Sequence, residues 1–187
     1  MTKNEIARLV HKDFFDKCRN AIDNGFYLEA LCMEYNAIES RAIVIMKLLE
    51  MPCGIYKDDI KAHSIGLATK LLCIRDFMDD ETIFSKTKLY SDKYQKPEKY
   101  ISKMRDWCES RNQRIHRLYD DVEKYDKIMA NSRIIAIEGY DYAYTMYKEA
   151  NRLKGLYKKH PEFFERKHCE CKASKGTCMD LINKFSK

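Results

Sequence analysis

The chain has 187 residues, of which 35 are Lys or Arg and 29 are Asp or Glu, giving a formal net charge of +6. This length suits one domain with a sizeable core, and three prolines and six glycines leave few places for a linker. No segment approaches the roughly 18 apolar residues that span a bilayer, and the N-terminal segment lacks the apolar run of a signal peptide. We therefore expect a soluble, cytoplasmic protein without a membrane partner, whose modest positive charge favours acidic partners.

Apolar residues at helical spacing predict helices through the first half of the chain. The first covers the pattern from Ile6 to Ile22 and stops at Asn24-Gly25, and the second runs from Phe26 to Met51. Their short connection is typical of antiparallel neighbours. A third helix is predicted from Ile60 to Met78, and the polar stretch Asp79 to Lys96 is predicted to be mostly loop.

The second half continues in the same way. Pro97 suits the first turn of a helix, a further helix is predicted from Ser110 to Ile128, and the last long helix from Ser132 to Tyr157. No segment shows sustained alternation of apolar and polar residues, which argues against a sheet. The predicted fold class is all-α, an up-and-down bundle of about five helices over residues 1–160, with a short C-terminal extension over residues 161–187.

The segment from Ser110 to His116, with sequence SRNQRIH, carries the residues most suited to chemistry. Ser110 and Gln113 fit a capping box, which predicts a helix that restarts at Ser110 and places Arg111 and His116 close to its beginning. The free N–H groups and the dipole at such a helix start attract phosphate.

Arginine and histidine together can cleave RNA without a metal ion. A guanidinium holds a phosphodiester as a planar, permanently charged fork, and an imidazole relays protons as general base or acid. The imidazole would take the proton from the ribose 2′-hydroxyl, which then attacks the adjacent phosphorus. On an ideal helix, however, Arg111 and His116 differ by roughly 140° around the axis, so they do not share a face. A two-fold dimer that brings two Arg/His sets together would solve this and would supply the acid for the leaving group.

The segment from Arg111 to His116 resembles the signature of the HEPN superfamily. That signature is an arginine, usually followed by a polar residue, with a histidine four to six residues beyond it. Asn112 supplies the polar residue here, and long helices precede and follow the motif. The resemblance covers roughly residues 1–158.

The resemblance implies a HEPN-like helical bundle that forms a homodimer and acts on RNA as a metal-independent endoribonuclease. Arg111 and His116 become the catalytic candidates, with Asn112 orienting them, and no cofactor is required. Such proteins serve as toxins with an antitoxin partner, in phage defence, or in effector complexes. One subgroup has a tyrosine two residues after the histidine, where this chain has Leu118 followed by Tyr119, and this departs from that subgroup. Some members are non-catalytic modules for nucleotide or RNA binding or for assembly, and that alternative stays open.

Other polar residues within the helices have two readings. Glu39 is a candidate orienting carboxylate for the motif, while Glu34, Glu39 and Arg41 together suit the polar edge of an amphipathic helix. Four tyrosines of the last predicted helix could either stack on RNA bases or pack within the protein: Tyr140, Tyr142, Tyr144 and Tyr147.

The cysteines fall into two groups. Reduced thiols packed as small hydrophobes are expected for the scattered residues Cys18, Cys32, Cys53, Cys73 and Cys108. The C-terminal cluster is a candidate structural zinc site with four ligands, His168, Cys169, Cys171 and Cys178. Its spacing lacks paired Cys-x-x-Cys knuckles, so a basic tail that binds no metal is the other interpretation. A helical interaction protein with a zinc-bound tail is a further functional alternative.

Overall fold

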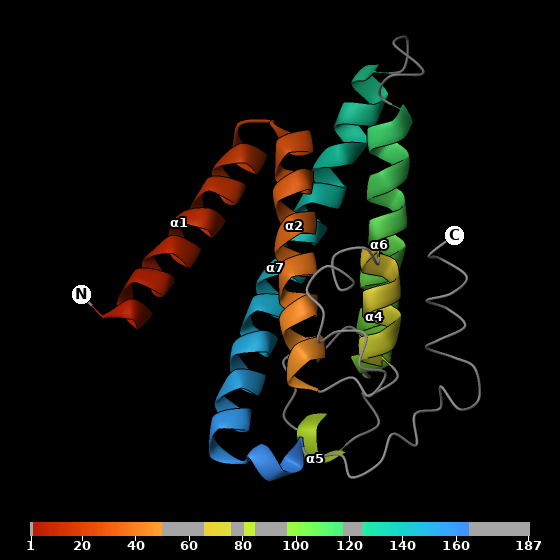
Figure 1. Ribbon diagram of the computed structural model, residues 1–187. Coiled ribbons are helices and arrows are strands. Elements are labelled where there is room, and N and C mark those ends of the chain that lie inside the picture. Colours follow the sequence, from red (N-terminus) through yellow and green to blue (C-terminus); the bar gives the residue numbers. More distant parts are fainter. Residues whose placement is uncertain (1, 50–65, 76–80, 85–96, 118–124, 165–187) are drawn as a thin grey trace. The chain divides into compact units, whose positions relative to one another are not determined.

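This computed structural model describes residues 2–49, 66–75, 81–84, 97–117 and 125–164. In chain order, the structure contains α1 (Lys3–Asp23), α2 (Tyr27–Leu48), α4 (Leu67–Arg75), α5 (Glu81–Phe84), α6 (Pro97–Arg117), α7 (Tyr125–Lys159) and the 3-10 helix η2 (Pro161–Phe163) (Figure 1). No strand occurs in these described ranges, and the predicted all-α fold class is confirmed. None of the helices in them is long and apolar enough to cross a membrane.

The chain divides into two compact units. The first unit consists of Met1–Ala37 and Trp107–Tyr144, and the second of Ile38–Asp106 and Thr145–Lys187. The helices α2, α6 and α7 each contribute one part to the first unit and the other part to the second.

Both ends of α1 are fixed by local hydrogen bonds. At its start, Thr2 and Glu5 form a capping box in which each side chain accepts a hydrogen bond from the other residue's backbone N–H. At its end, Gly25 has a φ of 82°, and the N–H of Phe26 donates to the carbonyl oxygen of Ala21 over 2.8 Å. This is a Schellman ending, which glycine favours because it lacks a Cβ. The predicted stop at Asn24-Gly25 is confirmed, and α2 begins two residues later (Figure 1).

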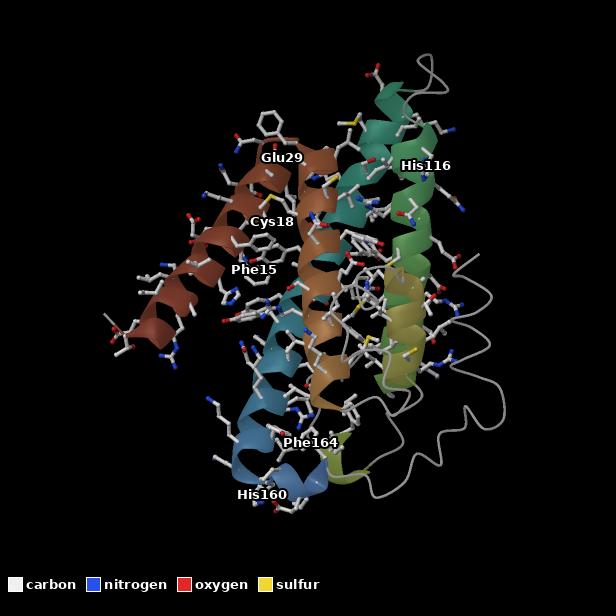
Figure 2. The ribbon with its side chains drawn as sticks, viewed as in Figure 1. Phe15, Cys18, Glu29, His116, His160 and Phe164 are labelled. Carbon is white, nitrogen blue, oxygen red and sulfur yellow. The ribbon has the colours of Figure 1, made fainter. Side chains whose placement is uncertain are left out.

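The core of the first unit is built where its four helical segments meet. Figure 2 shows Phe15 and Cys18 on the side of α1 that faces α2. Both are buried, as are Leu31 on α2 and Trp107 on α6. The periodicity predicts that the apolar residues of α1 are buried along the whole helix. In its N-terminal half, however, Ile6, Leu9 and Val10 are 47%, 53% and 60% exposed.

A glycine lets α7 approach α2 and α6 closely inside the first unit. Gly139 is buried, and a Cβ at that position would overlap the Glu34 carboxyl and lie 2.5 Å from the Trp107 ring. The indole N–H of Trp107 donates a 2.8 Å hydrogen bond to the carbonyl oxygen of Ile135, one turn before Gly139. Only glycine fits this contact, and its low helix propensity is the accompanying cost, about 1 kcal/mol relative to alanine.

In the second unit, two charged pairs each combine a fully buried side chain with a partly exposed one. The Lys70 ammonium, fully buried on α4, contacts the Glu39 carboxylate of α2 at 2.6 Å. On α7, the Arg152 guanidinium contacts the buried Glu149 carboxylate at 2.6 Å and donates to the carbonyl oxygen of Ile83 on α5. These contacts tie α4 to α2 and α5 to α7 within the unit.

Several helix boundaries differ from the sequence-based expectation. The described part of the third helix is α4, and residues 60–65 and 76–78 lie outside the described residues. In the stretch expected to be mostly loop, α5 adds one helical turn. The last helix begins at Tyr125 rather than Ser132, because the Ser132 hydroxyl donates to the carbonyl oxygen of Ile128 as a residue inside the helix instead of capping it.

Candidate functional site

The motif residues lie on a helix that does not restart. Helix α6 runs without interruption from Pro97 to Arg117, so Ser110 and Gln113 are interior residues and the predicted capping box is wrong. The buried residues Trp107 and Cys108 continue the packed face of α6 up to Ser110, which keeps this part helical. The backbone N–H groups around Arg111 are therefore engaged within the helix, and any attraction for phosphate must come from side chains.

The Arg111 side chain is held by three neighbours in the first unit. Its guanidinium carbon lies 4.5 Å from the centre of the Tyr35 ring on α2. One terminal nitrogen donates to the Asn112 side-chain oxygen over 2.9 Å, and the other donates to the Cys32 sulfur over 3.6 Å. The aromatic face and the two acceptors fix the plane of the guanidinium without neutralising its charge.

The charge of Arg111 is uncompensated within the described part of the chain. The side chain is half-buried, its Nε is buried without a hydrogen-bond partner, and no described carboxylate lies within ion-pair distance of it. A buried donor that lacks an acceptor costs about 1 to 3 kcal/mol. An anionic ligand would accept from the terminal nitrogens instead, because each of them carries a second N–H besides the one donated to Asn112 or Cys32.

His116 lies near the C-terminal end of α6 (Figure 2). Its side chain is exposed and forms no hydrogen bond or ion pair with the described residues. Arg111 turns toward α2, and an ideal helix separates the two positions by roughly 140°. The structure therefore places Asn112 in contact with Arg111, but it does not bring His116, which faces solvent, together with them.

Two residues of this site were not identified by the sequence reasoning. Tyr35 falls within the second predicted helix, and Cys32 was expected to be a packed thiol. Cys32 is in fact exposed, which corrects that expectation, while the free thiols of Cys18, Cys73 and Cys108 are buried. Residues three apart on a helix are neighbours, so Cys32 and Tyr35 share a face, and this spacing was the available signal.

The Glu34 carboxyl is a core group and not part of a polar edge. Its side chain is fully buried, and Oε1 accepts a hydrogen bond from the Cys18 thiol over 3.6 Å, whereas Oε2 has no partner among the described residues. Burial raises the pKa of Glu34 to about 9, although the Cys18 hydrogen bond lowers it. Burial, helped by the neighbouring Glu34 carboxyl, raises the pKa of Cys18 to about 12. Glu34 is therefore protonated at neutral pH.

The other polar residues of the second predicted helix are engaged within the second unit. The Glu39 carboxylate contacts Lys70, as described above. Arg41 donates to the Ser40 hydroxyl over 3.1 Å, and burial lowers the pKa of Arg41, with the Tyr147 hydroxyl acting in the opposite direction. Neither residue has a described contact with the motif.

Tyrosines on α7 pack against one another and against α1 in the first unit. The Tyr140 and Tyr144 rings are stacked with centroids 6.3 Å apart, and the Arg19 guanidinium lies 5.1 Å from the Tyr140 centroid. Phe15 packs edge-on against both tyrosine rings. Tyr142 is buried and contacts Trp107 edge-on. The faces of Tyr140 are thus occupied by protein groups.

The candidate zinc ligands His168, Cys169, Cys171 and Cys178 lie outside the described residues. Among the residues that the structure does describe, no group of three or more potential metal ligands occurs. Comparison of the chain with protein-family models, with curated proteins and with solved structures finds no match.

Proposed function

We propose that this protein is a HEPN-type endoribonuclease that cleaves RNA without a metal ion, using Arg111 and His116 from two copies of the chain. The observation that carries the proposal is the state of Arg111. A guanidinium that is half-buried, oriented by an aromatic ring, and without a described carboxylate partner suits an anionic ligand. An exposed imidazole five residues later on the same helix supplies the proton-transfer group.

The reaction needs a base, an acid and a positive charge near one phosphodiester. The His116 imidazole of one copy takes the proton from the 2′-hydroxyl, and the 2′-oxygen forms a bond to phosphorus. The bond from phosphorus to the 5′-oxygen breaks, and the second imidazole, already protonated, gives its proton to that oxygen. The products are a 2′,3′-cyclic phosphate and a free 5′-hydroxyl. Arg111 binds the non-bridging oxygens and stabilises the charge that develops on them.

A second copy enters the proposal for a geometric reason. Arg111 and His116 of one chain do not share a helix face, since five residues turn an α-helix by roughly 140° beyond a full turn. Under two-fold symmetry, the Arg111 of one copy and the His116 of the other can face a single phosphodiester. Asn112 orients Arg111 through the hydrogen bond between their side chains.

The direct test is RNA cleavage by the His116→Ala variant. Replacing an exposed side chain leaves the fold intact, so activity should fall by at least about 10²-fold, the usual contribution of a general acid or base. His160→Ala is the matched control, because His160 is also exposed and lies after α7 in the second unit (Figure 2). Equal cleavage by His116→Ala and wild-type protein would rule the proposal out.

A second candidate function is a non-catalytic module that binds RNA or a nucleotide. The separation of Arg111 and His116 around α6 favours it, because one copy alone cannot place both groups on one phosphodiester. This alternative predicts that RNA binds with an affinity that depends on Arg111 while no cyclic phosphate appears. Analysis of the RNA ends after incubation separates the two functions.

The biological setting we propose is a cytoplasmic toxin or phage-defence effector, held in check by an antitoxin or joined to an effector complex. This follows from the resemblance of the Arg111–His116 segment to HEPN proteins. Induced expression of the wild-type chain should then arrest growth, whereas the His116→Ala chain, expressed equally, should not.

A further inference from the structure

A pocket lies beside the motif in the first unit. It has a volume of about 120 Å³ and is partly enclosed, and the described residues that line it are Ser110, Gln113 and Arg114 of α6 and Ile128 of α7. The three α6 residues share one face because they are spaced three and four positions apart. None of the roles proposed above for Arg111, Asn112 and His116 uses this pocket.

The lining combines hydrogen-bonding groups with one apolar wall. Arg114 is half-buried, and its guanidinium forms no hydrogen bond or ion pair with the described residues. Gln113 offers an amide that both donates and accepts, Ser110 offers a hydroxyl, and Ile128 offers a flat apolar contact. A phosphate would make no favourable contact with the apolar Ile128 side chain. A planar ring with carbonyl oxygens on its edge would pack on Ile128 and also form hydrogen bonds with the polar side chains.

The size of the pocket favours a single ring. An enclosed cavity of about 150 Å³ holds one benzene molecule, so a partly open pocket of about 120 Å³ suits a single six-membered ring with one edge outside, whereas a fused two-ring system would leave most of one ring outside. Uracil and cytosine are six-membered rings with at least one carbonyl acceptor. Arg114 can donate to that carbonyl, and the Gln113 amide can pair with the neighbouring donor and acceptor on the ring edge.

The pocket is adjacent to both motif residues along the surface of α6. Gln113 precedes His116 by three positions, and Arg111 precedes Arg114 by three, and residues at this spacing have Cβ atoms roughly 5 to 6 Å apart. A nucleotide whose base enters the pocket therefore carries its ribose and phosphate toward His116 or Arg111.

We propose that this pocket is a base-binding subsite that selects a pyrimidine of the bound RNA, with Arg114 and Gln113 as the specificity residues. The proposal rests on the proposed RNA-cleaving function for its biological meaning, but the binding itself does not require cleavage.

The test measures binding of mononucleotides to the full-length wild-type protein by calorimetry. Uridine and cytidine monophosphate should bind, whereas adenosine and guanosine monophosphate and inorganic phosphate should bind at least about tenfold more weakly, the effect of one lost hydrogen-bonded group. Arg114→Met and Gln113→Ala should each remove this preference. Arg133→Met is the matched control, since Arg133 is an exposed arginine of α7 in the same unit and should leave binding unchanged.

The possible outcomes distinguish the failure of the subsite from the failure of the endoribonuclease. Equal binding of all four mononucleotides, equally tight binding of phosphate alone, or unchanged binding by both variants would overturn the pyrimidine subsite. Pyrimidine binding that is lost in Arg114→Met, in a protein that leaves RNA intact, would support the subsite and reject the endoribonuclease. Cleavage of RNA with no base preference would do the reverse.

Discussion

The guanidinium carbon of Arg111 lies 4.5 Å from the centre of the Tyr35 ring, and one nitrogen of the same guanidinium donates to the Cys32 sulfur. The ring and the sulfur come from α2, whereas Arg111 comes from α6, so the packing of these two helices in the first unit sets the plane of the fork. A cation over an aromatic face keeps its full charge, which makes this arrangement suited to holding an anion.

Arg111→Lys tests the importance of the fork. Lysine keeps the charge, but it has no planar group to stack on Tyr35 and only one nitrogen with which to bind a phosphate. We expect kcat/KM for RNA to fall by about 10²-fold, with an unchanged midpoint of thermal unfolding. Arg19→Lys is the control, because Arg19 also lies over a tyrosine ring in the first unit and should have no effect on cleavage. Full activity in Arg111→Lys would show that charge alone suffices.

Two glycines of α7 predict opposite effects of the same substitution. A Cβ at Gly139 meets the Glu34 carboxyl and the Trp107 ring, and we expect Gly139→Ala to destabilise the protein by about 1 to 3 kcal/mol. A Cβ at Gly155 would have no neighbour within 4 Å among the described residues, so Gly155→Ala should stabilise the protein by up to about 1 kcal/mol through helix propensity. Urea unfolding measures both. Similar changes in the two variants would mean that α7 does not approach Trp107 as described.

Glu34→Gln should change how stability depends on pH. The folded pKa of Glu34 is about 9 against an ordinary value of 4.5, so the protonated form favours folding. Its contribution is complete below about pH 4.5 and is lost as pH rises toward 9, amounting to about 3 kcal/mol by pH 7. Glutamine does not ionise, so the variant should match wild type near pH 4 and exceed it increasingly above pH 5. Parallel curves for the two proteins over this range would contradict a buried, protonated Glu34.

The thiols of Cys18 and Cys32 should react very differently. The pKa of Cys18 is raised to about 12 and its side chain is buried, whereas Cys32 is exposed. Since the thiolate is the reactive form, iodoacetamide at pH 8 should label Cys32 in the native protein and leave Cys18 unmodified until denaturant is added. Peptide mass spectrometry reports each site separately. Labelling of Cys18 at the rate of Cys32 in native protein would contradict the packing of α1 on α2.

Helical periodicity predicted the elements well where one face is buried along its length. The last predicted helix has a buried apolar face, made of Ile135, Tyr142, Ala143, Met146, Ala150 and Leu153. On α1 the same periodicity predicted the helix, but its N-terminal apolar residues are exposed. The pattern along one segment shows which face of its helix is apolar, but it does not show how much of that face another helix covers. The burial of a residue is therefore harder to predict than the helix that carries it.

Local signals failed where tertiary packing outweighs them. The Ser110 and Gln113 pattern is a capping box only when the preceding residue leaves the helix, and the buried Trp107 and Cys108 keep α6 continuous. Glu34 was assigned to a polar edge because glutamate is rarely buried without a charged partner, yet it lies protonated against Gly139. The neighbours of Arg111 could not be predicted, because contacts between α2 and α6 join residues 79 positions apart.

The most direct test of the composite site is a mixing experiment with wild-type and His116→Ala chains. The proposed reaction uses the two imidazoles of one dimer as base and acid, so a mixed dimer lacks one of them and should not cleave RNA. Equal mixing after mild dissociation leaves about a quarter of the dimers fully wild-type, and activity should fall to about a quarter of the value for the same total amount of wild-type protein. A mixture that keeps about half of that activity, although mixed dimers are detected by native mass spectrometry, would contradict the account.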